Sequence, residues 1–318
     1  MEMHCWHVKC QQCVMKQKGW TEEMTLFFDL LVVGIAVGAL YGLLALSVSL
    51  IYASLDIIHF AQGELFTLGA FLGWLMYSKG VPFIIAALLS ALLTALFAIL
   101  IQKVVYNPIL SISGGFSVRG LTFVVAGFGM STILQNSYWL VWGAVSKTYG
   151  KNFGENIKIG SMTIQPIYLI IMAVALVIMV GLYLMFKKTK MGLAMKAVSY
   201  NKNISSLMGI NVSVVVAFSF GLAAFLSTIS GILSAQIIFV RYNMAAVMLQ
   251  KAFSAAVVGG LGNPYGAIIG GLMIGVIETF GGNIIGAQYK DIISFVIMII
   301  VLMFKPSGLF ATRTKQKA

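Results

Sequence analysis

Charged side chains are scarce in this sequence. Only 9% of its 318 residues are Asp, Glu, Lys or Arg, whereas a soluble domain has roughly 25%. Hydrophobic residues make up 60%, and the mean hydropathy is +0.97. This excludes an ordinary soluble domain and predicts an integral membrane protein, in which each run of about 20 apolar residues crosses the bilayer as a helix. The net charge of +12 then indicates which loops face the cytoplasm. Aromatic residues are not found together with basic ones on one face, so the sequence does not predict nucleic-acid binding.

Cysteine is rarer still. The three cysteines lie within the first 13 residues, where two histidines accompany them: Cys5, Cys10, Cys13, His4 and His7. Cys10 and Cys13 have the spacing of zinc ligands, but no second Cys or His pair follows at the distance typical of a zinc finger. We expect residues 1–23 to be a non-structural N-terminal extension, with a zinc site as the alternative. The apolar run that follows is too long for the core of a cleaved signal peptide.

Sequence motifs of catalysis and nucleotide binding are also missing. The chain contains no G-x-x-x-x-G-K-[ST] phosphate loop, no H-E-x-x-H and no G-x-S-x-G. We therefore expect no enzymatic activity and no cofactor in this chain. If transport consumes ATP, another polypeptide must hydrolyse it.

Long apolar runs are what the sequence does contain. They predict an all-α polytopic membrane bundle with about 8–9 membrane-crossing helices: eight full-length candidates and a shorter one at 244–260. Two breaks, at 53–64 and at Asn263-Pro264, predict broken or re-entrant elements. The first is either a broken helix lining a cavity or the start of a helix, at about Phe60, that carries Glu64 into the membrane. The predicted membrane domain covers residues 24–310, and residues 311–318 form a basic cytoplasmic tail.

One loop between apolar runs is strongly basic. Residues 187–211 carry five lysines and no acid, which predicts a cytoplasmic location. Apolar positions on both sides of the polar stretch 199–203 predict two short helices at the membrane face. The alternative is a solvated loop that only sets topology. An even number of crossings must separate this loop from a cytoplasmic C-terminus, and that count requires the segment at 244–260 to cross.

Glycine is concentrated in two stretches. Glycines spaced four apart in the first span form one smooth helix face, and a second group surrounds Asn263-Pro264. The residues predicted to pack helices closely are Gly34, Gly38, Gly42, Gly266, Gly270, Gly271 and Gly275. The two halves of the chain also echo one another weakly, each with an interrupted element. Such paired breaks point to a transporter path, although chance similarity of small and apolar residues explains them as well.

Two acidic residues fall inside the predicted hydrocarbon layer. A charge there costs about 2.5–3.5 kcal/mol on insertion scales, so Glu64 and Glu278 should face inward. Each either lines a transport path or is held neutral by a hydrogen bond to another helix. Asp29, Asp56 and Asp291 lie at span ends and are expected at the interface. The residues predicted to line a path are His59, Gly63, Glu64, Gly259, Gly260, Gly262 and Glu278.

Five stretches resemble a known family. They are Asp56–Glu64 with Thr67–Ala70, Gly129–Asn136, Met191–Asn211, Lys251–Gly271, and the ending Tyr289–Phe295 with Lys305–Gly308. Together they resemble LivH-type permeases of branched-chain amino acid ABC importers, over about residues 24–308 and in the same order. The family often has Asn at the position of His59 and more basic residues at 106–119 and 187–202.

This resemblance implies a permease subunit of the bacterial inner membrane. Implied partners are a LivM-type permease subunit, two cytoplasmic ATPase subunits and an extracytoplasmic binding protein. Residues 187–211 would then contain the coupling helix, with Gly192, Lys196, Asn201 and Gly209 at matching positions. Branched-chain amino acids are the expected substrates, with urea or a short amide as family alternatives. The rival function is a self-sufficient proton-coupled carrier that uses Glu64 and Glu278.

Overall fold

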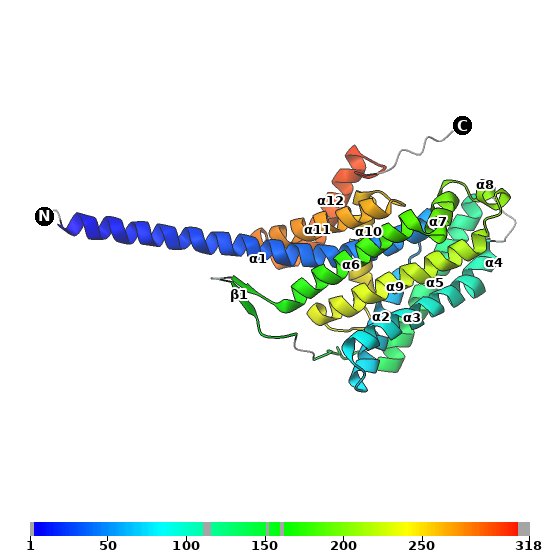
Figure 1. The fold of residues 1–318 in the computed structure, drawn as a ribbon, viewed down its shortest axis with the longest axis horizontal. Helices are drawn as coiled ribbons and strands as arrows, with labels where there is room; N and C mark the ends of the chain where they lie inside the picture. Colours follow the sequence, from blue (N-terminus) through cyan, green and yellow to red (C-terminus); the bar gives the residue numbers. More distant parts are fainter. Residues whose placement is uncertain (1–2, 111–115, 151–152, 160–161, 311–318) are drawn as a thin grey trace.

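The protein is a bundle of long helices (Figure 1). The computed structural model describes residues 3–110, 116–150, 153–159 and 162–310. The elements are α1 (Met3–Leu55), α2 (Gln62–Ser78), α3 (Phe83–Ile101), the π-helix η1 (Gln102–Tyr106), α4 (Asn107–Leu110), α5 (Phe116–Trp142), β1 (Ile157–Ile159), β2 (Met162–Ile164), α6 (Pro166–Lys188), α7 (Lys190–Tyr200), α8 (Lys202–Leu207), α9 (Val212–Ile238), α10 (Met244–Gly259), α11 (Pro264–Ile284), the 3-10 helix η2 (Ala287–Tyr289) and α12 (Lys290–Phe304).

Six of the described helices are long and apolar enough to cross a membrane. They are Met24–Leu55, Phe83–Ile109, Pro166–Lys188, Val212–Ile238, Pro264–Ile284 and Ala287–Phe304. The prediction of an all-α membrane bundle is confirmed. The predicted count of eight or nine crossings is not confirmed, because only six described helices meet the requirements of length and apolar composition. Helix α2 has 17 residues and α10 has 16, so both are short. Helix α5 is long enough, but Ser, Thr, Gln and Asn residues interrupt its apolar sequence.

The bundle has two distinct ends. At one end the antiparallel hairpin β1–β2 pairs Ile157 with Ile164, and we call this the hairpin end. Lys147 and Val240 exchange backbone hydrogen bonds of 2.9 and 2.8 Å, which joins the segment before the hairpin to the C-terminus of α9. Helices α7 and α8 lie at the opposite end (Figure 1), which we call the α7–α8 end. In the same view α1 projects well beyond the bundle on the N-terminal side.

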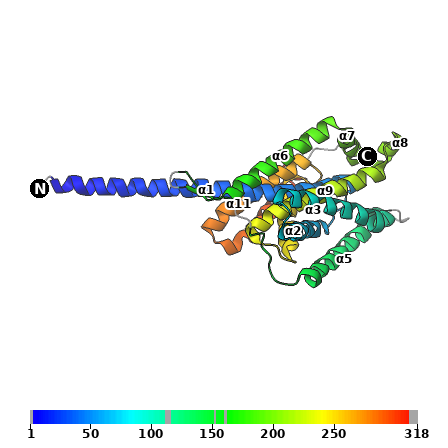
Figure 2. The same ribbon diagram turned by 60° about the horizontal axis from the view of Figure 1, so that its bottom comes forward.

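Helix α1 forms the centre of the bundle. Its residues from Ala39 to Ile51 are all buried, and it packs against α6, α9, α10 and α11. Helix α5 lies apart from this centre in the turned view (Figure 2). It touches the rest of the bundle mainly through α2 and α4.

Glycines bring α1 and α11 into backbone contact. A Cβ built on Gly38 would lie 2.9 Å from the Leu272 Cα, and one built on Gly34 would lie 3.0 Å from the Val276 Cα. From the opposite helix, a Cβ on Gly275 would overlap the backbone of Gly38, and one on Gly271 that of Gly42. The two helices can therefore approach this closely only with glycine at these positions.

Candidate functional site

The break between α1 and α2 begins at a strained residue. Asp56 has a φ of 59°, a left-handed conformation that costs a residue with a Cβ free energy unless its surroundings hold it. Its carboxylate lies 3.3 Å from the Lys202 ammonium of α8. A break at 53–64 was predicted from the sequence. The structure adds that an ion pair connects its first turn to α8.

His59 follows within this break and is enclosed by aromatic rings. Its centroid lies 4.8 Å from Tyr106, 5.2 Å from Phe220 and 6.0 Å from Phe123. The side chain is buried, and its Nδ1 has no hydrogen-bond partner among the described residues. The aromatic surroundings come from η1, α5 and α9, so this histidine holds three elements at the break together.

Glu64 lies in the first turn of α2 and is also buried. Ser131 of α5 donates a hydrogen bond of 3.1 Å to its Oε1, while its Oε2 has no partner within the described part of the chain. Tyr138 donates to the backbone carbonyl of the same residue at 3.0 Å. These contacts attach α5 to α2 through polar groups.

Between α2 and α9 a row of buried hydroxyls extends the polar region. Gln62 Nε2 donates to Ser227 Oγ at 2.6 Å, and Ser227 donates to Ser47 Oγ at 2.9 Å. The hydroxyls of Thr67 and Thr228 are buried without a partner among the described residues. None of these five polar side chains was predicted from the sequence to be a site residue, unlike the neighbouring His59 and Glu64.

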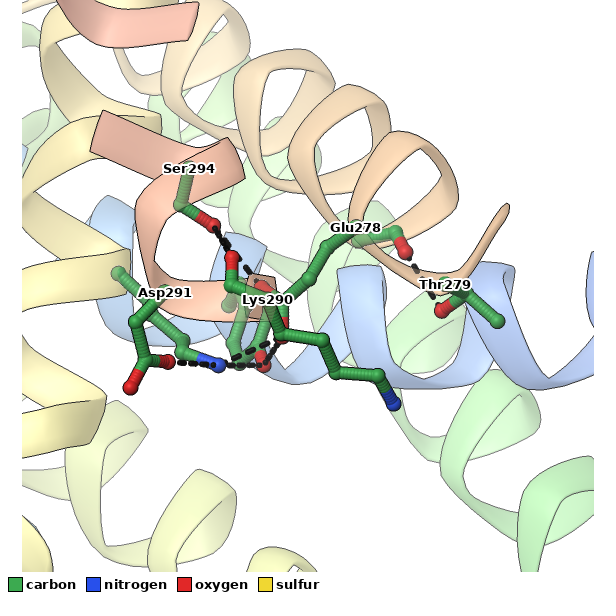
Figure 3. A network of polar contacts seen from close by, with 8 residues as sticks. Glu278, Thr279, Lys290, Asp291 and Ser294 are labelled. Atoms are coloured by element: carbon green, nitrogen blue, oxygen red, sulfur yellow. Dashed lines mark hydrogen bonds and ion pairs between the residues drawn. The ribbon is translucent and has the colours of Figure 1, made fainter. Parts of the chain in front are cut away.

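Glu278 is the centre of a buried charge network (Figure 3). Its Oε1 lies 2.6 Å from the Lys251 ammonium and accepts a hydrogen bond of 3.2 Å from Tyr41. Ser294 donates to its Oε2 at 2.9 Å. Lys251 also contacts the Asp291 carboxylate at 3.0 Å. The network therefore joins α1, α10, α11 and α12 around one lysine.

Sequence reasoning missed Lys251. Spacing along one helix does not reveal this partner of Glu278, because Lys251 lies on another helix, 27 positions earlier. The signal was present nonetheless, because a single lysine in the short apolar helix α10 must either face inward and pair or lie at an end. Asp291, expected at the interface, is 60% exposed and closes the network from outside.

The predicted path glycines Gly259, Gly260 and Gly262 lie in the tight turn between α10 and α11. Gly260 and Gly262 have φ values of 103° and 82°, and a Cβ on Gly259 would overlap the backbone of Gly266. The C-terminal segment crosses this turn, because Leu309 N donates to Val258 O at 2.9 Å. Gly63 lies elsewhere, where α2 approaches Leu249 of α10.

The predicted pair of short helices at 187–211 is present as α7 and α8. Thr189 caps α7 by accepting from Gly192 N at 3.0 Å, and Asn201 caps α8 by accepting from Ile204 N at 3.0 Å. A Cβ on Gly192 would meet the Phe186 Cα at 2.7 Å, so this glycine permits the sharp turn out of α6. Gly209, at a φ of 84°, lies in the turn that follows α8, and Lys196 is exposed.

The exposed surface of α7 and α8 is apolar as well as basic. The exposed fractions are 56% for Leu193, 71% for Tyr200, 87% for Leu207 and 76% for Met208. The capped helix ends show that this is ordered structure, and the exposed side chains leave an apolar patch at the α7–α8 end.

Comparison with protein families decides the identity of this architecture. Residues 30–302 match the family model described as branched-chain amino acid transport system / permease component. The chain belongs to this family. The resemblance seen in its sequence motifs is thereby confirmed, and so is the prediction of a multi-pass membrane protein of the inner membrane.

Several relatives of this permease family align over nearly its whole length. BraD, a high-affinity branched-chain amino acid transport system permease protein of Pseudomonas aeruginosa, is 30% identical over 93% of this chain and 99% of its own. LivH of Escherichia coli is 27% identical with the same coverage. A probable LivH of Methanocaldococcus jannaschii is 26% identical over 84% of this chain and 87% of its own. Among solved structures, PsaBC from Streptococcus pneumoniae in complex with Fab aligns at 19% identity and a TM-score of 0.47, covering 88% of this chain and 91% of that one.

The sequence predicts metal ligands in the N-terminal tail of this permease alone. The side chains of residues 1–23 lie outside what the structure describes, so the zinc alternative stays a prediction. Among the described residues, no group of three or more His, Cys, Asp or Glu side chains could hold a metal ion.

Proposed function

We propose that this chain is the membrane permease subunit of an ABC importer for branched-chain amino acids, driven by ATPase subunits that bind at α7 and α8. The observation that carries the proposal is the ordered apolar and basic patch of these helices. Apolar side chains this exposed, next to lysines, mark a protein-binding surface on a water-facing end. The names of the relatives support the substrate class.

Orientation follows from charge. The α7–α8 end carries the lysines of residues 187–202 and Lys305, so it faces the cytoplasm by the positive-inside rule. The hairpin end then faces outward, where a binding protein delivers the substrate. A second permease subunit completes the transporter, as the family resemblance implies.

Nine of the described helices cross the membrane in this proposal. Helices α2, α5 and α10 run between the two ends like the six longer ones. For α10 the support is direct: its start follows Val240 at the hairpin end, and its last turn contacts Leu309 near the α7–α8 end. At 1.5 Å per residue α10 spans about 24 Å, less than the roughly 30 Å hydrocarbon layer. Four crossings then separate the coupling helices from the C-terminus, an even number.

Transport proceeds by alternating access. Movement of the ATPase subunits displaces α7 and α8, and the glycine-packed helices reseat between two arrangements. The part of the break around His59 and the buried polar groups of α2, α5 and α9 are the path candidates, because irregular backbone at membrane depth occurs only where it is buried in protein or lines a cavity.

A proton-coupled carrier gains no support from the contacts of the two buried acids. Glu278 bonds to Tyr41, Lys251 and Ser294, and Glu64 bonds to Ser131. The two carboxylates share no partner among the described residues. Each is anchored within its own set of helices instead of forming one relay.

The test is co-purification with the ATPase subunits. Leu207→Glu places a charge in the middle of the apolar patch, and Lys196→Glu reverses the charge beside it. Both variants should insert normally and lose at least about tenfold of the bound ATPase, since a buried charge without a partner costs several kcal/mol. The matched control is Lys305→Glu, at the same end but outside α7 and α8. Normal co-purification of both patch variants would refute the docking assignment.

A further inference from the structure

A cavity of about 550 Å³ opens beside α8. Its wall is formed by the α1–α2 break, η1, α4, the α7–α8 junction and the start of α9. Pockets that hold small molecules have volumes of roughly 300–1,000 Å³, so the cavity is large enough for an amino acid. It lies at the α7–α8 end, away from the Glu278 network.

The cavity has one positive and one negative group. Of its lining residues that the structure describes, only Lys202 and Asp56 are charged, and their side chains, 34% and 54% exposed, lie 3.3 Å apart. An anionic or cationic ligand would leave one of these charges uncompensated. A zwitterion satisfies both, with its carboxylate on Lys202 and its ammonium group on Asp56.

A buried acceptor adjoins the charged pair. Gln102, in the π-helix η1, is only 1% exposed, and its Oε1 has no hydrogen-bond partner among the described residues. A buried amide oxygen without a partner is unfavourable, and π-helical turns frequently occur at functional sites. An ammonium group bound to Asp56 has further N–H donors, and the Gln102 Oε1 can accept a hydrogen bond from one of them.

The rest of the wall is suited to an aliphatic side chain. Leu55, Val198 and Val216 line the cavity and are buried. They provide apolar contact opposite the charged pair, which is the arrangement that a small hydrophobic amino acid requires.

We infer that this cavity binds a free α-amino acid with an apolar side chain at the coupling-helix end of the permease. Lys202 holds the carboxylate, while Asp56 and Gln102 hold the ammonium group. The inference rests on the proposed function for the choice of leucine-like ligands, and it adds a second site apart from the transport path. Because Lys202 belongs to α8, a bound amino acid stabilises one position of the coupling helices. The cytoplasmic concentration of the amino acid thereby regulates transport.

Binding of radiolabelled L-leucine to the full chain in nanodiscs tests this site without any ATPase or binding protein. We expect saturable binding that leucinamide and isovalerate do not displace, because each lacks one of the two charges. Lys202→Met and Asp56→Asn should each weaken binding at least about tenfold. Asparagine also tolerates the left-handed backbone at position 56. Gln102→Leu serves as a third variant, and Lys305→Met is the control expected to bind normally.

Each result decides the matter separately from the proposed function. Leucine binding that is unchanged in Lys202→Met and Asp56→Asn would overturn the assignment of this cavity. Absence of binding to the wild-type chain at millimolar leucine would do the same, even if the assembled transporter takes up leucine normally. Displacement by O-phosphoethanolamine at lower concentration than by leucine would reassign the cavity to a zwitterionic lipid headgroup. Failure of leucine uptake by the assembled transporter, with cavity binding intact, would count against the proposed function alone.

Discussion

At the scale of single residues, Lys251 joins polar side chains from three other helices, α1, α11 and α12. Its ammonium group has three N–H donors, and they contact Tyr41, Glu278 and Asp291. The pair with Glu278 is buried, whereas Asp291 is 60% exposed. Burial decides which of these ion pairs matters for stability, because a carboxylate left alone in a low-dielectric interior has no solvent to compensate its charge.

Replacing Lys251 with Met should destabilise the protein strongly. We expect the free energy of unfolding to fall by about 3–5 kcal/mol, because Glu278 is left charged and buried. The double variant Lys251→Met with Glu278→Gln should recover most of the loss. The Tm in detergent micelles measures both. Asp291→Asn is the matched control and should cost no more than about 1 kcal/mol; an equal loss in the two single variants would contradict this account.

At the scale of elements, the α1–α11 contact is set by the absence of side chains. Gly38 of α1 and Gly275 of α11 allow backbone atoms to meet, and this close packing replaces the hydrophobic driving force that helices lack in lipid. Not every glycine of the bundle has this role. Gly181 of α6 has no atom within 4 Å of the position its Cβ would occupy.

Gly275→Ala should therefore separate α1 from α11. The added Cβ overlaps Gly38 backbone atoms, and overpacking of this kind costs about 1–3 kcal/mol. We expect a lower Tm and a greater sensitivity to SDS. For comparison, Gly181→Ala should leave the Tm unchanged or raise it slightly, because alanine is the better helix former by about 1 kcal/mol. If both variants behaved alike, helix propensity rather than close packing would explain the result.

At the scale of the whole molecule, the two ends of the bundle have different chemistry. The hairpin end is fixed by backbone bridges and by Tyr149, whose hydroxyl donates to Ala70 O at 2.8 Å. Burial raises the pKa of Tyr149, so it stays a protonated donor at neutral pH. The α7–α8 end carries capped short helices, exposed apolar side chains and the 550 Å³ cavity. This asymmetry agrees with the proposed function, in which substrate enters at the hairpin end and the ATPase subunits bind at the α7–α8 end.

Cysteine labelling tests the orientation of the ends. In a variant with Cys5, Cys10 and Cys13 changed to Ser, Arg241→Cys should react with an impermeant maleimide from outside the inner membrane. Lys196→Cys should react only after that membrane is permeabilised. Both positions are exposed. Labelling of Lys196→Cys from outside would refute the cytoplasmic location of α7 and α8 and the even number of crossings after them.

The sequence by itself determined the class of the fold, because a run of apolar residues long enough to cross a bilayer has only the helix available to satisfy its backbone. It also located the α1–α2 break, the paired short helices at 187–211 and the glycines of the α1–α11 contact, since each has a local pattern. Only the tertiary structure decided which groups meet across helices. The partnership of Lys251 with Glu278, the packing of His59 against Tyr106 and the pairing of Asp56 with Lys202 all join residues distant in the chain. Side chains on separate helices meet through the rotation and depth of each helix, and no local periodicity specifies those.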